Sequence, residues 1–215
     1  MKKITLLLVC FLALHTANAQ VTIKPGIRAG LNLATLTNTN LDTKADFYVG
    51  GFVAIKLAKF YTLQPELTYS RQGATGSGFY NADYYYGYDP VIPAYGGSND
   101  TDYSLQYLSL GVMNKFNIID GFHAIVGPTL DFKVGDNFTG YAADELMGVD
   151  LGLNAGLGYT LPMGLTIEAR YKIGFADIFG DNYSGYNDDY YYDDNGNYDD
   201  VILNSVVQLG LSYAF

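Results

Sequence analysis

Hydrophobic residues alternate with polar or small residues in eight separate stretches of the chain. A period of two places successive side chains on opposite faces of a β-strand. In the clearest stretch, 147–159, Met, Val, Leu, Ala and Tyr alternate with Gly, Asp and Asn. Runs of about ten residues are long enough to cross a membrane at a tilt. The predicted strands span residues 23–33, 47–57, 63–69, 107–116, 122–133, 147–159, 165–175 and 203–215.

The two faces of these strands differ in charge. One face carries no charged residue, and its clearly polar members are Asn114 and Ser205. A charged interior and an apolar outer face are typical of transmembrane barrels. The alternation alone does not say which face lies inside, so a secreted soluble calyx that binds an apolar ligand stays an alternative. The charged face carries Lys24, Arg28, Lys56, Glu66, Lys115, Asp131, Lys133, Asp150, Glu168, Arg170 and Lys172.

The links between the predicted strands alternate in length. Short links at 58–62, 117–121 and 160–164 separate four longer ones. Outer-membrane barrels have this arrangement, with long extracellular loops and short periplasmic turns. The sequence therefore predicts an all-β fold, an eight-stranded antiparallel up-and-down transmembrane β-barrel. The four long links span 34–46, 71–106, 134–146 and 176–202.

The first residues of the chain predict a signal peptide, 1–19. A basic start is followed by an apolar stretch, 4–14, and then by Ala17 and Ala19 in an Ala-x-Ala cleavage site. Eleven apolar residues are fewer than the number, about 20, that a membrane-spanning helix needs. We therefore expect export and a mature barrel domain at 20–215.

Composition narrows the possible partners of residues 20–215. The one cysteine, Cys10, would leave with the signal peptide, so no disulfide or cysteine-based metal site is expected. Without Lys2 and Lys3, ten basic residues face 22 acidic ones, a net charge of −12. Nucleic acid is therefore not an expected partner, because phosphate binding needs a basic surface.

Three segments resemble strands of the bacterial outer-membrane β-barrel proteins often labelled "porin family". They are 23–33 (IKPGIRAGLNL), 61–73 (YTLQPELTYSRQG) and 107–116 (YLSLGVMNKF). Members often show an acidic residue and a proline in the third of these, where this chain has Ser109 and Gly111. The resemblance extends over the mature chain. It implies a place in the cell outer membrane, among its lipid and lipopolysaccharide, and hardly any particular activity.

The charged face supplies one candidate site, an interior charge cluster. Side chains can fill the interior of an eight-stranded barrel. The inward residues include seven basic and four acidic side chains, which could pair into a solid core. They could also line a narrow, slightly cationic path for small solutes. The cluster consists of Arg28, Glu66, Asp131, Asp150, Glu168, Arg170 and Lys172.

The predicted loops supply further candidates. Loop 176–202 has eight aspartates and no Lys or Arg. Tyr191 and Ile202 stand where an EF-hand needs its first and last ligands, so that calcium motif fails. The second and fourth loops also hold many tyrosines, which are common in binding surfaces and in membrane girdles. The alternatives for the acidic loop are a solvated surface segment and a weak metal site. The weak metal candidates are Asp193, Asp194, Asp199 and Asp200.

We expect neither catalysis nor a cofactor. The one histidine outside the signal peptide, His123, follows a short turn and so lies at the periplasmic rim, and no nucleophile elbow or phosphate-binding loop is present.

Tyr213 and Phe215 end the chain on the apolar face, which resembles the signal that barrel-assembly machinery recognises in its clients. The function expected is a monomeric outer-membrane barrel with a structural or surface-interaction role, toward an extracellular protein or glycan. A narrow solute channel is the alternative.

Overall fold

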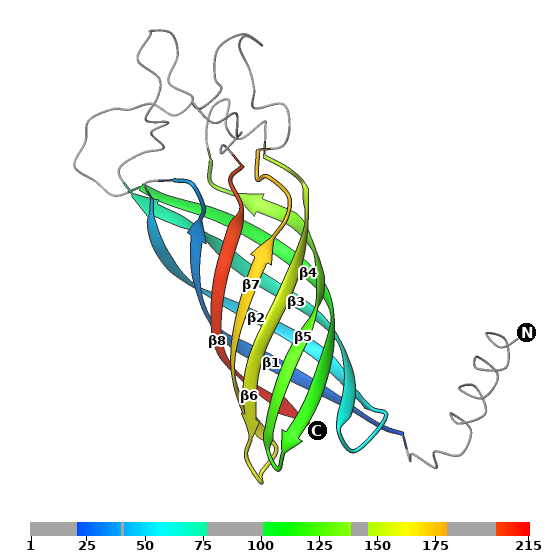
Figure 1. The fold of residues 1–215 in the computed structure, drawn as a ribbon. Coiled ribbons are helices and arrows are strands. Elements are labelled where there is room, and N and C mark those ends of the chain that lie inside the picture. Colours follow the sequence, from blue (N-terminus) through cyan, green and yellow to red (C-terminus); the bar gives the residue numbers. More distant parts are fainter. Residues whose placement is uncertain (1–20, 40, 77–100, 139–145, 180–200) are drawn as a thin grey trace, which may run out of the picture.

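The protein forms one closed barrel of eight antiparallel strands, each paired with its neighbours in sequence, and β1 pairs with β8 (Figure 1). This computed structural model describes residues 21–39, 41–76, 101–138, 146–179 and 201–215. The predicted eight-stranded up-and-down barrel is therefore confirmed. The strands are β1 (Thr22–Leu36), β2 (Asp42–Lys56), β3 (Tyr61–Gly76), β4 (Thr101–Ile119), β5 (Phe122–Asp136), β6 (Val149–Thr160), β7 (Leu165–Gly174) and β8 (Asn204–Ala214).

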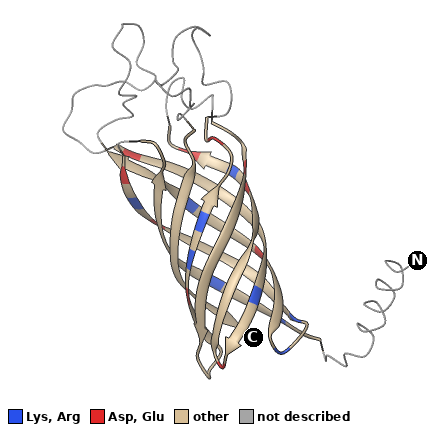
Figure 2. Ribbon diagram, in the orientation of Figure 1, with Lys and Arg blue, Asp and Glu red and all other residues tan. Residues whose placement is uncertain are grey.

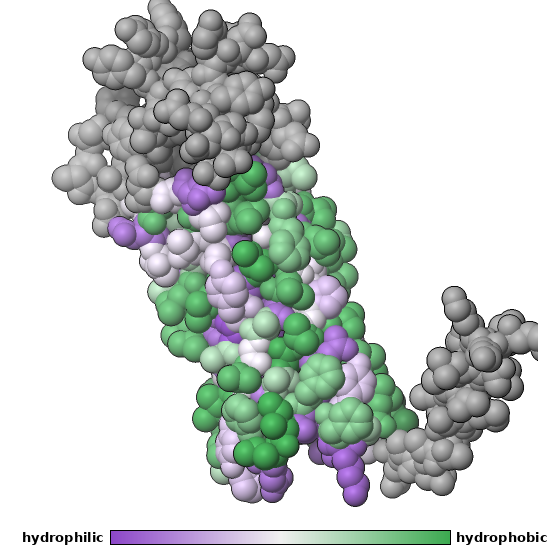
Figure 3. All heavy atoms as spheres, viewed as in Figure 1, coloured by the Kyte–Doolittle hydropathy of each residue, from purple (hydrophilic) through white to green (hydrophobic). Residues whose placement is uncertain are grey.

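The period-two pattern sets which side chains face outward. On β1, Leu31 is 57% exposed whereas its neighbour Asn32 is fully buried. The same alternation runs along β6, where Leu153 is 40% exposed and Asn154 is 4% exposed. Figure 3 shows hydrophobic residues over much of the barrel face in view. Because the polar side chains lie inside and the apolar ones outside, the soluble-calyx alternative is wrong.

Several strands extend beyond their predicted ends. β1 and β2 stay paired as far as Ala34 and Lys44, so only residues 37–41 connect these strands. The prediction of a long first loop at 34–46 is therefore wrong. The tight connection includes Asn38 with a positive φ of 55°, a conformation that Asn adopts more readily than most residues. The links at 77–100, 137–148 and 175–203 are longer, as expected.

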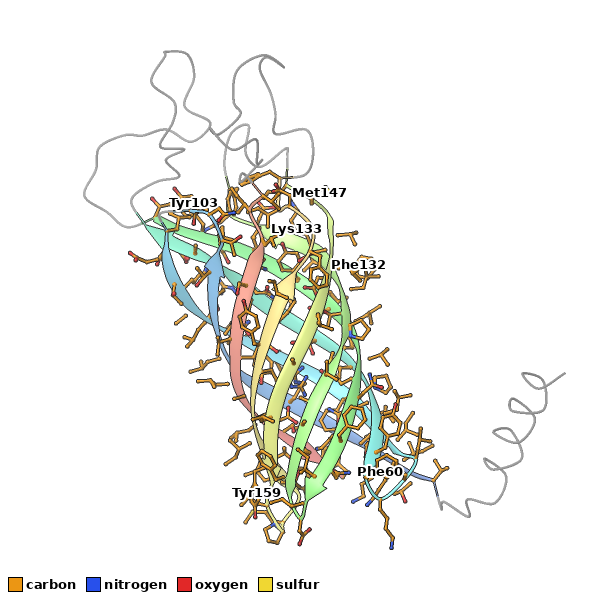
Figure 4. The ribbon with its side chains drawn as sticks, viewed as in Figure 1. Phe60, Tyr103, Phe132, Lys133, Met147 and Tyr159 are labelled. Carbon is orange, nitrogen blue, oxygen red and sulfur yellow. The ribbon has the colours of Figure 1, made fainter. Side chains whose placement is uncertain are left out.

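The short turns lie at the opposite end of the barrel, together with the end of β8 (Figure 1). Two of them contain a glycine with positive φ, Gly121 and Gly164, as tight turns require. In the orientation expected for an outer-membrane barrel, this is the periplasmic end. Outward aromatic residues gather here, including Phe60 and Tyr159 (Figure 4), as expected at a membrane interface.

The described residues contain no helix that is both long and apolar enough to cross a membrane. Several predictions fall outside the described part of the chain. They concern the signal peptide with Ala17 and Ala19, the tyrosines of the second and fourth loops, and the weak metal candidates Asp193, Asp194, Asp199 and Asp200.

Candidate functional site: the barrel interior

Glu66 on β3 lies at the centre of the polar interior. Its carboxylate accepts a hydrogen bond of 2.5 Å from Arg28 on β1 and bonds of 2.9 and 3.0 Å from Arg170 on β7. Gln64 donates a further bond of 2.8 Å to the same carboxylate. All four side chains are at least nine-tenths buried. A buried charge is tolerated only when it is paired and hydrogen-bonded, and Glu66 satisfies both conditions.

Arg170 connects this centre to a second carboxylate. It donates bonds of 3.1 and 2.6 Å to one oxygen of Glu168, which precedes it by two residues on β7. His123 is fully buried nearby, with its Nε2 atom 3.7 Å from the other carboxylate oxygen of Glu168. Two arginines therefore face two glutamates, so these four charges sum to zero.

The remaining predicted residues lie nearer the long loops. Lys172 forms a buried ion pair with Asp131 on β5. Asp150 belongs to no ion pair among the described residues and instead accepts backbone N–H bonds of 3.2 and 3.0 Å from Phe175 and Ala176. The structure thus brings Arg28, Glu66, Glu168 and Arg170 together. It leaves Lys172 with Asp131 as a separate pair and uses Asp150 to hold the backbone that follows β7.

Uncharged side chains continue the network. Asn32 donates to Ser70 at 2.9 Å and accepts from Gln208 at 2.9 Å, and Gln72 donates to Ser70 at 2.8 Å. Asn204 also donates to Gln72. Sequence analysis missed these residues because an inward Asn or Gln looks like any polar side chain until the strands are in register.

The end of the barrel under the long loops is filled by apolar side chains, which we call the mouth cluster. The ring centroids of Tyr103 and Phe138 are 5.4 Å apart, and those of Phe138 and Phe179 are 6.2 Å apart. Figure 4 places Tyr103 at this end. Each member is at most 8% exposed. The cluster consists of Leu36, Leu41, Ala74, Tyr103, Leu105, Tyr107, Phe138, Leu146, Ile178 and Phe179.

Half of the mouth cluster lies outside the strands. Leu41 precedes β2, Phe138 and Leu146 belong to the β5–β6 link, and Ile178 and Phe179 follow β7. These residues come from short stretches without a period-two pattern, so sequence analysis assigned them to loops and overlooked them. A run such as Asp177-Ile178-Phe179 inside an otherwise polar loop was the available signal.

Little open space remains between the buried ion pairs. A polar cavity of about 20 Å³ is bounded by charged and hydroxyl side chains of several strands. A cavity of this size holds about one water molecule. Its lining residues are Arg28, Glu66, Thr68, Ser70, Ser109, Thr129, Asn154, Lys172 and Gln208.

The family model for the outer membrane protein beta-barrel domain matches residues 18–180. The chain belongs to this family. As a member of it, the protein is located in the cell outer membrane, where its apolar outer surface contacts lipid. No curated protein matches the sequence.

Three solved structures are similar to this family member. Neisserial surface protein A is 12% identical, with a TM-score of 0.47, and the match covers 90% of this chain and 97% of that one. The outer-membrane protein Ail of Yersinia pestis, in a phospholipid bilayer nanodisc, is 14% identical with a TM-score of 0.47, covering 90% and 100%. The outer-membrane protein AlkL in lipid bilayers is 10% identical with a TM-score of 0.41, covering 89% and 90%.

Proposed function

We propose that the protein is a closed outer-membrane barrel that does not conduct solutes and that acts at the cell surface through its extracellular loops. The observation that carries this proposal is the contact between Arg170 on β7 and Glu66 on β3, which crosses the lumen from wall to wall. A solute would have to break this contact, so that Glu66 would keep only Arg28 and Arg170 would keep only Glu168 as ion-pair partners. Losing a contact between buried charges is unfavourable, because both groups have already given up their hydration.

The mouth cluster supports the same proposal. Among the described residues, a hydrated solute entering at this end would meet Tyr103, Phe138 and Phe179, which are buried against one another. Displacing packed aromatic side chains exposes apolar surface to water, which is unfavourable in proportion to the area. A solute would therefore meet two barriers in series, the apolar mouth cluster and the charged Arg170–Glu66 contact. Both oppose a narrow channel.

The role at the surface rests on the composition of the loops. Segments 77–100 and 180–200 are rich in tyrosine, which offers a large contact area at low cost in conformational entropy. Segment 180–200 is also acidic and contains no Lys or Arg. This combination suits a basic patch on an extracellular protein better than an acidic glycan, since like charges oppose association.

Binding to panels of extracellular proteins and glycans, with the barrel held in lipid nanodiscs, tests this role. The matched control is a variant in which a short turn replaces 180–200, checked for folding by its heat-dependent gel mobility. We expect the full-length protein to bind at least one basic protein, more weakly at high salt, and the control to lose that binding. Equal binding by both, or binding of neither to any panel member, would contradict a surface role for this loop.

The same proposal includes a signal peptide at 1–19 that is cleaved after Ala19, a monomeric state, and no catalytic activity. Mass spectrometry of the protein purified from outer membranes tests the cleavage, with an expected first residue of Gln20.

A further inference from the structure

The basic side chains are distributed unevenly along the barrel. Toward the long loops Lys44 pairs with Asp102 at 2.6 Å, Arg71 with Asp46 at 3.3 Å, and Lys133 with Asp136 at 2.9 Å. Arg28, Arg170 and Lys172 are also paired, in the middle of the interior. The lysines at the periplasmic end differ, because the exposed Lys24, Lys56 and Lys59 form no ion pair with any described residue, and neither does the half-buried Lys115.

These three lysines lie in one corner of the periplasmic end. Lys24 on β1 and Lys56 on β2 have register positions two residues apart on neighbouring strands and share the inward face, and Lys59 lies in the turn that follows β2. All three are exposed. Figure 2 shows this gathering of basic residues near the β2–β3 turn. We call Lys24, Lys56 and Lys59 the basic corner.

The carboxylate of Phe215 adjoins the basic corner, because the N–H of Phe215 donates a bond of 2.9 Å to the carbonyl of Pro25, the residue after Lys24. Glu168 is the buried carboxylate nearest this end, and Arg170 already binds it at 2.6 Å. Among the described residues of the short turns, Asp120 is the acidic one, and it lies in the β4–β5 turn. Three lysines against one adjoining carboxylate leave a net positive charge at the corner, which is available to an anion from outside the chain.

The apolar residues beside the three lysines indicate which anion the basic corner can reach. Ile23 is 62% exposed, Leu57 is 38% exposed and Phe60 is 64% exposed, and all three flank the lysines in sequence. Figure 4 shows Phe60 at the β2–β3 turn. Apolar and aromatic side chains at this height lie at the boundary of the inner leaflet, where phospholipid head groups begin. Lys59 lies in the turn, and Lys24 and Lys56 are exposed near the ends of their strands, so their flexible stems can carry the ammonium groups past the strand ends to the phosphates.

We propose that the basic corner binds anionic phospholipid head groups, of the phosphatidylglycerol type, in the inner leaflet of the outer membrane. Lysine presents a compact charge with three N–H donors, which suits a phosphate oxygen in any orientation. Three lysines in one corner of the barrel favour a lipid with net negative charge over a zwitterionic one, because the amine of phosphatidylethanolamine is repelled. A lipid bound here would hold the β1–β3 side of the barrel at a fixed depth.

Native mass spectrometry of the protein released from nanodiscs that contain both phosphatidylethanolamine and phosphatidylglycerol tests the proposal. The measured quantity is the ratio of the two lipids that the folded barrel retains. We expect the wild-type protein to be enriched in phosphatidylglycerol relative to the nanodisc. The triple variant K24Q/K56Q/K59Q should lower this enrichment at least fivefold, since each lysine near an anionic surface contributes roughly a fivefold preference.

The matched control is Lys133→Gln, which removes a lysine at the opposite end, where Asp136 pairs with it. It should leave the enrichment unchanged. Should the triple variant fail to fold, as judged by gel mobility without heating, Lys59→Gln alone changes only the turn and should still lower the enrichment. Equal retention of both lipids by the wild-type protein, or an equal loss in K133Q and in the lysine variants, would overturn the proposal.

Discussion

Arg170 on β7 donates two hydrogen bonds to Glu66 on β3, 2.9 and 3.0 Å long, across the whole width of the barrel. Four steps around the barrel separate these strands in either direction, so they stand on opposite walls. The fork of the guanidinium matches the two oxygens of the carboxylate, which adds geometric specificity to the attraction between the charges. The two walls are therefore braced by one contact between residues that are 104 positions apart in the sequence.

Removing this brace should destabilise the barrel strongly. Arg170→Met leaves Glu168 without an ion-pair partner beyond His123, and leaves Glu66 with Arg28 alone. Loss of one partner of a buried pair costs about 3–5 kcal/mol. The free energy of unfolding in lipid vesicles, measured by urea titration, should fall by this amount. The control Lys133→Met removes a less buried partner and should cost about 0–1 kcal/mol. Similar costs for the two variants would contradict the brace.

The facing of β6 gives a second prediction. Leu153→Arg places a charge on the lipid side near the middle of the strand, and it should lower the free energy of unfolding by about 2–4 kcal/mol. Asn154→Ala, the next residue and inward, should cost less, because the Oδ1 atom of Asn154 has no hydrogen-bond partner among the described residues. The same urea titration measures both. A larger loss for Asn154→Ala would mean that the lipid-facing side has been misassigned.

The alternation of hydrophobic and polar residues predicted the strands and divided their side chains into two faces, and the alternating lengths of the links favoured placing the charged face inside. The alternation did not predict the extracellular ends of the strands, where Lys44 and Asp46 on β2 and Arg71 on β3 lie beyond the apolar outer surface. There both faces of a strand can be polar, so strand and loop look alike in the sequence. The first loop was predicted too long for this reason.

The contacts inside the barrel could be predicted only in part. The inward position of Glu66 and Arg170 follows from the alternation, but their meeting depends on how far each strand is displaced along its neighbours around the closed barrel. The sequence pattern alone does not give the total displacement between strands on opposite walls. The mouth cluster was missed because Phe138 and Phe179 pack together only once the links after β5 and β7 fold back over the lumen.

The end of the chain gives a third prediction, on assembly. Tyr213 and Phe215 are 39% and 63% exposed on the outer surface, with ring centroids 5.3 Å apart. We propose that the barrel-assembly machinery recognises this pair of aromatic residues. Deleting Phe215 should reduce the heat-modifiable protein in the outer membrane severalfold, whereas folding of the purified variant into lipid vesicles should change only modestly. Normal assembly in cells would refute the signal and leave the barrel unaffected.

Conductance of single molecules in planar lipid bilayers tests the closed interior most directly. The barrel should insert without producing discrete current steps, because Arg170 and Glu66 cross the lumen and the mouth cluster fills the end above them. Insertion is verified independently by the gel mobility of protein recovered from the same lipid. Reproducible ohmic steps from the wild-type protein, absent from lipid alone, would contradict the account and would support a narrow solute channel instead.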